Sequence, residues 1–143
     1  MGKARQALLL NDTALAGNHG SQVVIDQLIR LAGEHGIAIA RRRAMDAPLD
    51  ELSTDGLDLV IVNGEGSLHH SKKAAKAIAQ VPAWAEARGL PAFLINSIYQ
   101  ENDAAIFEGV SGYRQIYVRD AQSSAELEAL GRKPEAVVDL SLT

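Results

Sequence analysis

Residues 63–70 concentrate side chains that can do chemistry. The segment contains Asn63, Gly64, Glu65, Gly66, Ser67, Leu68, His69 and His70. A carboxylate between glycines can act as a base or orient sugar hydroxyls, and a histidine can transfer protons near neutral pH. Glu65 and His69 are therefore candidate catalytic residues, and the glycines and remaining polar residues are candidate substrate contacts. The alternative is a helix-capping loop whose histidines face solvent.

A second glycine-rich stretch, residues 17–22, precedes an expected helix. Its candidate substrate-binding residues are Asn18, His19, Gly20 and Ser21. Glycines allow a tight turn, and the free N–H groups of a helix N-terminus attract anionic or hydroxyl-rich ligands. The alternative is an ordinary strand–helix turn with Ser21 as the N-cap.

Polar residues also follow two later apolar runs. Asn96 and Gln100 come after one run, where they could contact a substrate. The alternative is that these polar residues only form a turn. Arg119 follows another run and can hold a phosphate or carboxylate in a bidentate fork. Its alternative is an ion pair with a carboxylate inside the fold. We count all three residues as candidate substrate contacts.

A dinucleotide site is a weaker interpretation of the same glycines. The G-x-G-x-x-G fingerprint belongs after the first strand, whereas Gly64 and Gly66 follow the third, and His69 stands where the third glycine should be. The second expected strand ends in Arg41, Arg42 and Arg43 rather than an acidic residue. This disfavours NAD but suits the 2′-phosphate of NADP, unless the arginines form a solvated edge.

Short apolar runs alternate with helical patterns along the sequence, which is typical of a parallel α/β sheet. The expected strands are residues 7–10, 37–40, 57–62, 92–95, 116–118 and 136–138. These runs are continuous, as expected where helices cover both faces. We expect one Rossmann-like three-layer α/β domain over residues 1–143, with a mostly parallel sheet of about six strands. Ligands of such sheets bind beyond the carboxyl ends of the strands, where the polar stretches lie.

The helices expected between the strands have recognisable ends. Gly36 should close the first helix as a C′ glycine. An apolar stripe over residues 74–85 predicts a second helix, which Pro82 should kink or restart because proline has no N–H. A further helix over residues 121–130 should begin after Asp120 as its cap.

The composition excludes several classes of protein. The chain has 143 residues, of which 47% are hydrophobic and 22% charged, as in ordinary globular domains. It has no cysteine, which removes disulfides, thiol nucleophiles and thiolate metal sites, and its net charge of −4 argues against a nucleic-acid partner. No metal site is expected, because His69 and His70 are adjacent and no third ligand is evident. Without an apolar run of spanning length or a signal-peptide core, the expected location is the cytoplasm.

The polar stretches, taken together and in this order, resemble the polysaccharide pyruvyl transferase family. The matching segments are residues 11–13 with 18–21, residues 58–70, residues 94–97 with Gln100, residues 118–120 with Ser123, and residues 138–139. The Asn-Gly-Glu-Gly segment that ends in histidine is the most specific of them. The resemblance covers nearly the whole chain, but only the N-terminal half of what the family requires.

Members of that family resemble GT-B glycosyltransferases, in which two Rossmann-like domains face each other across a cleft. They transfer the enolpyruvyl group of phosphoenolpyruvate to sugar hydroxyls of cell-surface polysaccharides and form a pyruvate ketal. The resemblance implies that this chain is the acceptor-side domain, and that a second domain binds the donor. Glu65 would then orient or deprotonate the acceptor hydroxyl, and His69 would help to hold the substrate. The expected location is the cytoplasm, including the inner face of the membrane.

The implied partners are a sugar or polysaccharide acceptor and a phosphoenolpyruvate or nucleotide-sugar donor, with no cofactor and no nucleic acid. Three alternatives stay open: a GT-B glycosyltransferase domain that uses a nucleotide sugar, a nucleotide- or NADP-binding oxidoreductase domain, and a non-catalytic Rossmann-like module that binds a partner. A homo-oligomer is compatible with each of them.

Overall fold

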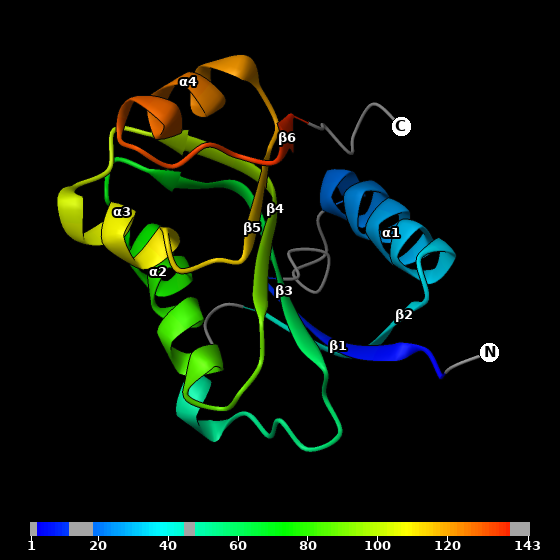
Figure 1. Ribbon diagram of the computed structural model, residues 1–143. Helices are drawn as coiled ribbons and strands as arrows, with labels where there is room; N and C mark the ends of the chain where they lie inside the picture. Colours follow the sequence, from blue (N-terminus) through cyan, green and yellow to red (C-terminus); the bar gives the residue numbers. More distant parts are fainter. Residues whose placement is uncertain (1–2, 12–18, 45–47, 138–143) are drawn as a thin grey trace.

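The structure of the chain is a computed structural model that describes residues 3–11, 19–44 and 48–137. Its sheet has six strands in the order β2-β1-β3-β4-β5-β6, and all neighbouring strands are parallel (Figure 1). The strands are β1 (Arg5–Leu10), β2 (Ile37–Arg43), β3 (Leu59–His69), β4 (Ala92–Gln100), β5 (Gln115–Val118) and β6 (Ala136–Val137). The expected Rossmann-like α/β fold is therefore confirmed.

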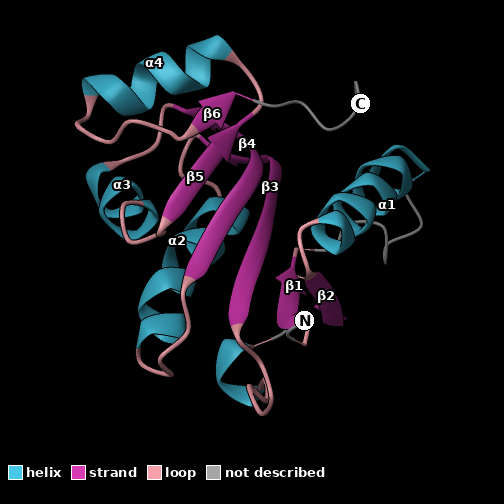
Figure 2. Ribbon diagram, turned by 45° about the vertical axis from the view of Figure 1, so that its right-hand side comes forward, coloured by secondary structure: helices cyan, strands magenta, loops and turns pink. Residues whose placement is uncertain are grey.

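Helices cover both faces of this sheet (Figure 2). The helices are α1 (His19–Glu34), α2 (Lys73–Glu86), α3 (Ala104–Val110) and α4 (Ala121–Ala129), and a short 3-10 helix, η2 (Leu49–Glu51), precedes β3. One face is covered by α1, and the other by α2, α3 and α4. Within the described residues, no helix has the length and apolar character needed to cross a membrane.

Side chains of the central strands alternate between two apolar cores. Leu8 and Leu10 of β1 belong to the core beneath α2, α3 and α4, whereas Ala7 and Leu9 belong to the core beneath α1. Successive residues of a strand point to opposite faces, so a strand covered on both sides must be apolar at every position. This is why the strands could be found as uninterrupted apolar runs.

The expected helix ends are confirmed where the structure describes them. Gly36 follows α1 with a φ of +75°, which is costly for residues with a Cβ. Asp120 caps α4, because its Oδ1 accepts a hydrogen bond of 2.7 Å from the N–H of Ser123. The interpretation of Ser21 as an N-cap is wrong, since α1 already begins at His19.

Strands β3 and β4 are longer than the sequence predicted. The expected strands 57–62 and 92–95 end before the polar residues that follow them, but β3 continues to His69 and β4 to Gln100. Beyond a register shift, the two extensions pair Leu68 with Tyr99. Both of these side chains are fully buried, so they prolong the apolar core beyond the expected ends of the strands. The main-chain pairing and this burial together keep the polar segments extended.

Helix α2 runs without interruption through Pro82, so the expected restart there is wrong. In a regular helix the N–H of residue 82 would donate to the carbonyl of Ile78, and proline has no N–H. The buried hydroxyl of Tyr113 donates to that carbonyl instead, at 2.7 Å. Burial raises the pKa of Tyr113 well above its ordinary value, so the hydroxyl keeps the proton that it donates.

The substitution Tyr113→Phe should lower the free energy of unfolding by about 1–3 kcal/mol, because it leaves a buried carbonyl without a donor. Urea unfolding followed by circular dichroism measures this change. In a Pro82→Ala background the restored N–H can donate to Ile78, so Tyr113→Phe should cost clearly less. Equal costs in the two backgrounds would contradict the compensating role of Tyr113.

Candidate functional site

The strand order places a topological switch point between β1 and β3. The chain leaves β1 for β2 on one side of it, and β3, β4, β5 and β6 then follow on the other side. Ligands of open α/β sheets bind in the crevice beyond the carboxyl ends of the strands at such a point. Asn11 follows β1 directly, and Asn63 lies in β3 beyond its pairing with β1, so both residues lie at this edge.

Three buried asparagines form a polar row across this edge. Asn11, Asn63 and Asn96 are 7%, 0% and 1% exposed, respectively. The Nδ2 of Asn11 donates to the main-chain carbonyl of Asn63 at 2.7 Å, and the Nδ2 of Asn96 donates to the Oδ1 of Asn63 at 3.0 Å. Burial of an amide is costly unless it is hydrogen-bonded, so these bonds fix the three side chains relative to one another.

Two members of this polar row have left-handed backbones. The φ angles of Asn11 and Asn96 are +60° and +53°, a region that asparagine tolerates better than other residues with a Cβ. Among the described residues, the buried Oδ1 of Asn96 has no hydrogen-bond partner. The polar row thus combines backbone strain with an unused acceptor at the edge where ligands of this fold bind.

Gly64 follows Asn63 in β3, at a point where Ser97 of β4 lies close to it. A Cβ at this position would lie 2.6 Å from both the Cβ and the Oγ of Ser97, which is itself fully buried. The sequence therefore has glycine here because the neighbouring strand leaves no room for a side chain.

The remaining candidates of this segment are spread along β3. Glu65, Gly66, Ser67 and His69 all belong to the strand, and their side chains lie outside the described part of the structure. Opposite Glu65–His69 the partner strand advances by only three residues, and opposite Asn63–His69 it advances by five, because of the register shift between Glu65 and Leu68. The rise of a strand then separates the backbones of Glu65 and His69 by roughly 10 Å, and those of Asn63 and His69 by roughly 16 Å. The structure therefore distributes the segment along an edge instead of gathering it into one compact centre.

The stretch after β1 is described only in part. Asn18 lies outside the described residues, whereas His19, Gly20 and Ser21 form the first turn of α1 without described side chains. Because α1 begins after the carboxyl end of β1, its first N–H groups belong to the same edge of the sheet as the polar row.

His70 lies just beyond the end of β3 and faces Glu101, which follows the end of β4. The Nε2 of His70 contacts the carboxylate of Glu101, and both side chains are more than half exposed. His70, Ser71 and Glu101 have φ angles of +52°, +50° and +50°, although none of them is glycine. Sequence reasoning missed Glu101, since the pairing depends on the extension of both strands.

Hydrogen bonds brace these strained residues. The N–H of Ser71 donates to the Oδ1 of Asn102 at 3.0 Å, and the Nδ2 of Asn102 donates to the carbonyl of Leu68 at 2.9 Å. The Oγ of Ser71 accepts from the N–H of Asp103 at 2.7 Å. Left-handed conformations of this kind persist only where the surroundings hold them, and they gather at functional sites.

The later candidates lie near these extensions. Gln100 is half-buried and ends β4, where its carbonyl accepts from the N–H of His70 at 2.9 Å. Arg119 follows β5 and is half-buried, and its N–H donates to the carbonyl of Ser97 at 2.8 Å. Ser123 is buried, and its Oγ accepts from the N–H of Tyr99 at 2.9 Å, so Ser123 has a structural role.

Tyr99 is a buried phenol in the extension of β4, where it pairs with Leu68 of β3. Burial, followed by the nearby carboxylates of Glu126 and Asp103, raises the pKa of Tyr99 to about 12. Its side chain is therefore neutral at physiological pH and contributes to the apolar core rather than to charge at the site.

The arginines at the end of β2 have structural contacts. The guanidinium of Arg41 donates to the carbonyls of Ser53 at 2.8 Å and Asp55 at 2.7 Å, which ties β2 to the segment before β3. Arg43 donates to the carbonyl of Arg42 at 2.8 Å. These bonds account for Arg41 without a bound phosphate.

Comparison with known proteins adds no family assignment: no family model, no curated protein and no solved structure matches the chain.

Over the described residues, no group of three or more histidine, aspartate or glutamate side chains is arranged to hold a metal ion. The candidate site is therefore defined by its own geometry. It consists of the polar row, the part of β3 that follows Asn63, and the hydrogen-bonded residues just beyond the ends of β3 and β4.

The left-handed backbone at Asn96 gives a first test of the polar row. Asn96→Ala and Asn96→Gly both remove the amide, but only alanine has a Cβ that is strained at positive φ. We expect the alanine variant to be less stable than the glycine variant by about 1 kcal/mol in urea unfolding. Equal stabilities would contradict the left-handed conformation.

The contact between Gly64 and Ser97 gives a second test. Gly64→Ala should lower the free energy of unfolding by about 1–3 kcal/mol through overpacking, and the penalty should shrink in a Ser97→Gly background. Gly33→Ala on α1 is the matched control, because a Cβ there meets nothing within 4 Å. The control should be neutral or stabilising by about 0.5–1 kcal/mol. A similar response at both glycines would refute the close approach of β3 and β4.

Proposed function

We propose that this chain is the acceptor-side domain of a sugar-modifying transferase of the polysaccharide pyruvyl transferase type. The observation that carries the proposal is the polar row at the switch point. It comprises three buried and mutually hydrogen-bonded asparagines, Asn11, Asn63 and Asn96, from which β3 extends with the Asn-Gly-Glu-Gly segment. Amides and carboxylates on rigid strands are the groups that orient the hydroxyls of a sugar.

The chemistry assigned to this domain is positioning and proton transfer. Glu65, two residues beyond the buried Asn63, accepts the proton of the acceptor hydroxyl as the hydroxyl oxygen bonds to C2 of phosphoenolpyruvate. At the same time the double bond between C2 and C3 opens, and an acidic group of the second domain, which holds the donor, protonates C3 so that the methylene becomes a methyl group. A second hydroxyl then bonds to C2 and closes the ketal, and phosphate leaves with the proton of that hydroxyl. This domain supplies no cofactor in that scheme, and the enzyme acts in the cytoplasm on precursors of cell-surface polysaccharides.

The length of the candidate edge supports a chain of sugars as acceptor. The polar row and the pair formed by His70 and Glu101 lie at opposite ends of an extended segment of about 16 Å. A monosaccharide spans only part of that length. An oligosaccharide lying along β3 reaches Glu65 and the strand end together, so the extension serves recognition and Glu65 serves the reaction.

A nucleotide sugar is the alternative donor. The first turn of α1 begins at the same edge of the sheet, and the N–H groups of a helix N-terminus suit a diphosphate. Under this alternative the chain belongs to a GT-B glycosyltransferase, and the acceptor edge keeps its role.

An amide-resolved NMR titration of this chain tests the proposal. The ligands are acceptor-type oligosaccharides, phosphoenolpyruvate, a nucleotide sugar and NADPH. We expect oligosaccharides to shift the amides of residues 63–70 and Asn96. Glu65→Gln should weaken that binding about tenfold or more, because a hydrogen bond to a charged group is lost. Glu128→Gln, an exposed carboxylate on α4, is the matched control and should bind as the unaltered chain does.

Other outcomes of the titration separate the alternatives. Shifts around α1 with the nucleotide sugar would favour the glycosyltransferase. Shifts centred on residues 41–43 with NADPH would replace the proposal by an oxidoreductase domain. The absence of any response to oligosaccharides, with the fold intact, would refute an acceptor site.

A further inference from the structure

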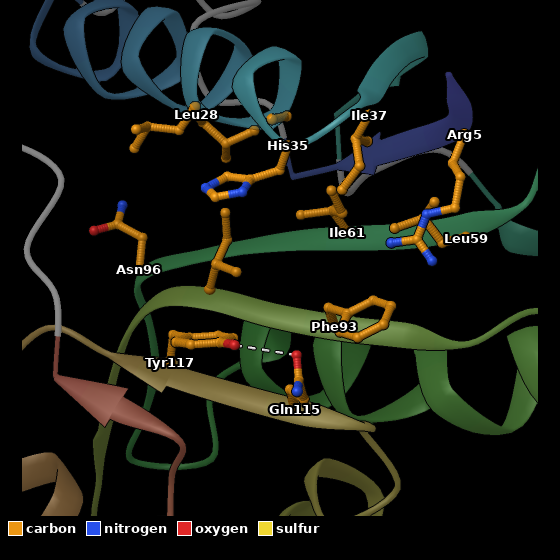
Figure 3. A pocket seen from close by; sticks show the side chains of 13 residues that line it. Arg5, Leu28, His35, Ile37, Leu59, Ile61, Phe93, Asn96, Gln115 and Tyr117 are labelled. Atoms are coloured by element: carbon orange, nitrogen blue, oxygen red, sulfur yellow. Dashed lines mark hydrogen bonds between the residues drawn. The ribbon is translucent and has the colours of Figure 1, made fainter. Parts of the chain in front are cut away.

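A groove of about 530 Å³ opens between α1 and the sheet (Figure 3). Its walls are apolar: Leu28 of α1 lies on one side, and Ile61, Phe93 and Tyr117 of three neighbouring strands lie on the other. The volume falls within the range of about 300–1,000 Å³ that is usual for small-molecule sites. The groove therefore has the size and the lining of a ligand site.

The groove exists because α1 covers only part of its face of the sheet. Its apolar residues pack on β1 and β3, and within residues 19–44 and 48–137 no second helix lies on this face over β4 and β5. The side chains of Phe93, Ile95 and Tyr117 consequently remain only half-buried. A parallel sheet normally has both faces covered, whereas the part of the chain that the structure describes leaves this apolar surface without a covering layer.

Hydrogen-bond donors from three separate elements line the groove at separate places (Figure 3). They are Arg5 at the start of β1, His35 after α1 and Gln115 at the start of β5. The Oε1 of Gln115 accepts from the Tyr117 hydroxyl at 3.1 Å, which leaves the Gln115 amide N–H groups as donors. The ring of His35 points into the space between α1 and the strands.

The charge of the groove is opposite to that of the chain. The chain has 18 acidic and 14 basic residues, yet the described residues that line the groove include one arginine and no aspartate or glutamate. Asp58 lies with Arg5 beside a neighbouring cavity, where its carboxylate accepts from the N–H of Gln6 at 2.8 Å. An apolar groove that is lined by an arginine and by no carboxylate is complementary to a molecule with an apolar body and an anionic head.

We propose that this groove binds an anionic amphiphile. The apolar body lies between Leu28 and Phe93, where it covers strand surface that is otherwise exposed to water. The oxyanion head lies at Arg5, whose guanidinium can bind it in a bidentate fork. The proposal requires neither Glu65 nor the strand ends, although Asn96 of the polar row also lines the groove.

Decanoate, used below its micellar concentration, is a suitable probe. An amide-resolved NMR titration should show saturable shifts at Leu28, Phe93 and Tyr117. Binding should be clearly tighter than that of decanol or decyltrimethylammonium, which share the apolar body, and it should weaken with added salt. Arg5→Gln should weaken decanoate binding about tenfold, because it removes the charged donor. Arg30→Gln is the matched control, since Arg30 is exposed and already pairs with Glu34.

Gln115→Glu tests the charge preference of the groove, because it adds a negative charge to the lining while keeping the shape of the side chain. It should weaken decanoate binding and strengthen the binding of decyltrimethylammonium. Equal binding of decanol and decanoate, with no effect of Arg5→Gln, would overturn the assignment of an anionic head. Absence of saturable shifts would overturn the site. Shifts that depend on protein concentration alone, with a doubled mass in solution, would show that a second copy covers the groove.

Discussion

The parallel pairing of β3 with β4 is the interaction on which the rest of the structure depends. The ladder begins where Val60 pairs with Ala92 and ends where His69 pairs with Gln100, and it lies in the middle of the sheet. It sets Asn63 beside Asn96 and brings Gly64 against Ser97. Because a slip of one residue would exchange the two faces of a strand, both cores and the polar row depend on this single register.

Local patterns were sufficient to predict the fold but not the extent of the strands. Continuous apolar runs identify strands covered on both faces, and Asp120 and Gly36 mark helix ends through their own side chain or backbone. Residues 63–69 have the composition of a loop, and only pairing with β4 makes them a strand. The available signal was Leu68, an apolar residue within a polar segment, whose burial the sequence alone does not reveal.

The candidate site was predictable in its location and not in its contacts. The carboxyl ends of the strands were identified from the order of elements, since parallel strands all end at one edge. The hydrogen bonds among Asn11, Asn63 and Asn96 join residues that are 52 and 33 positions apart, so they require the register of the sheet. The pair formed by His70 and Glu101 depends in the same way on two strand extensions.

The bond between Tyr113 and Ile78 also has a consequence for the nascent chain. It joins residues 35 positions apart, so the segment that forms α2 leaves the ribosome before the donor that completes its backbone bonding. Until then the carbonyl of Ile78 can accept a hydrogen bond only from water. A short helix that lacks one of its backbone hydrogen bonds is only marginally stable by itself. Helix α2 therefore becomes fully stable only when Tyr113 docks, which delays its consolidation until residue 113 has been synthesised.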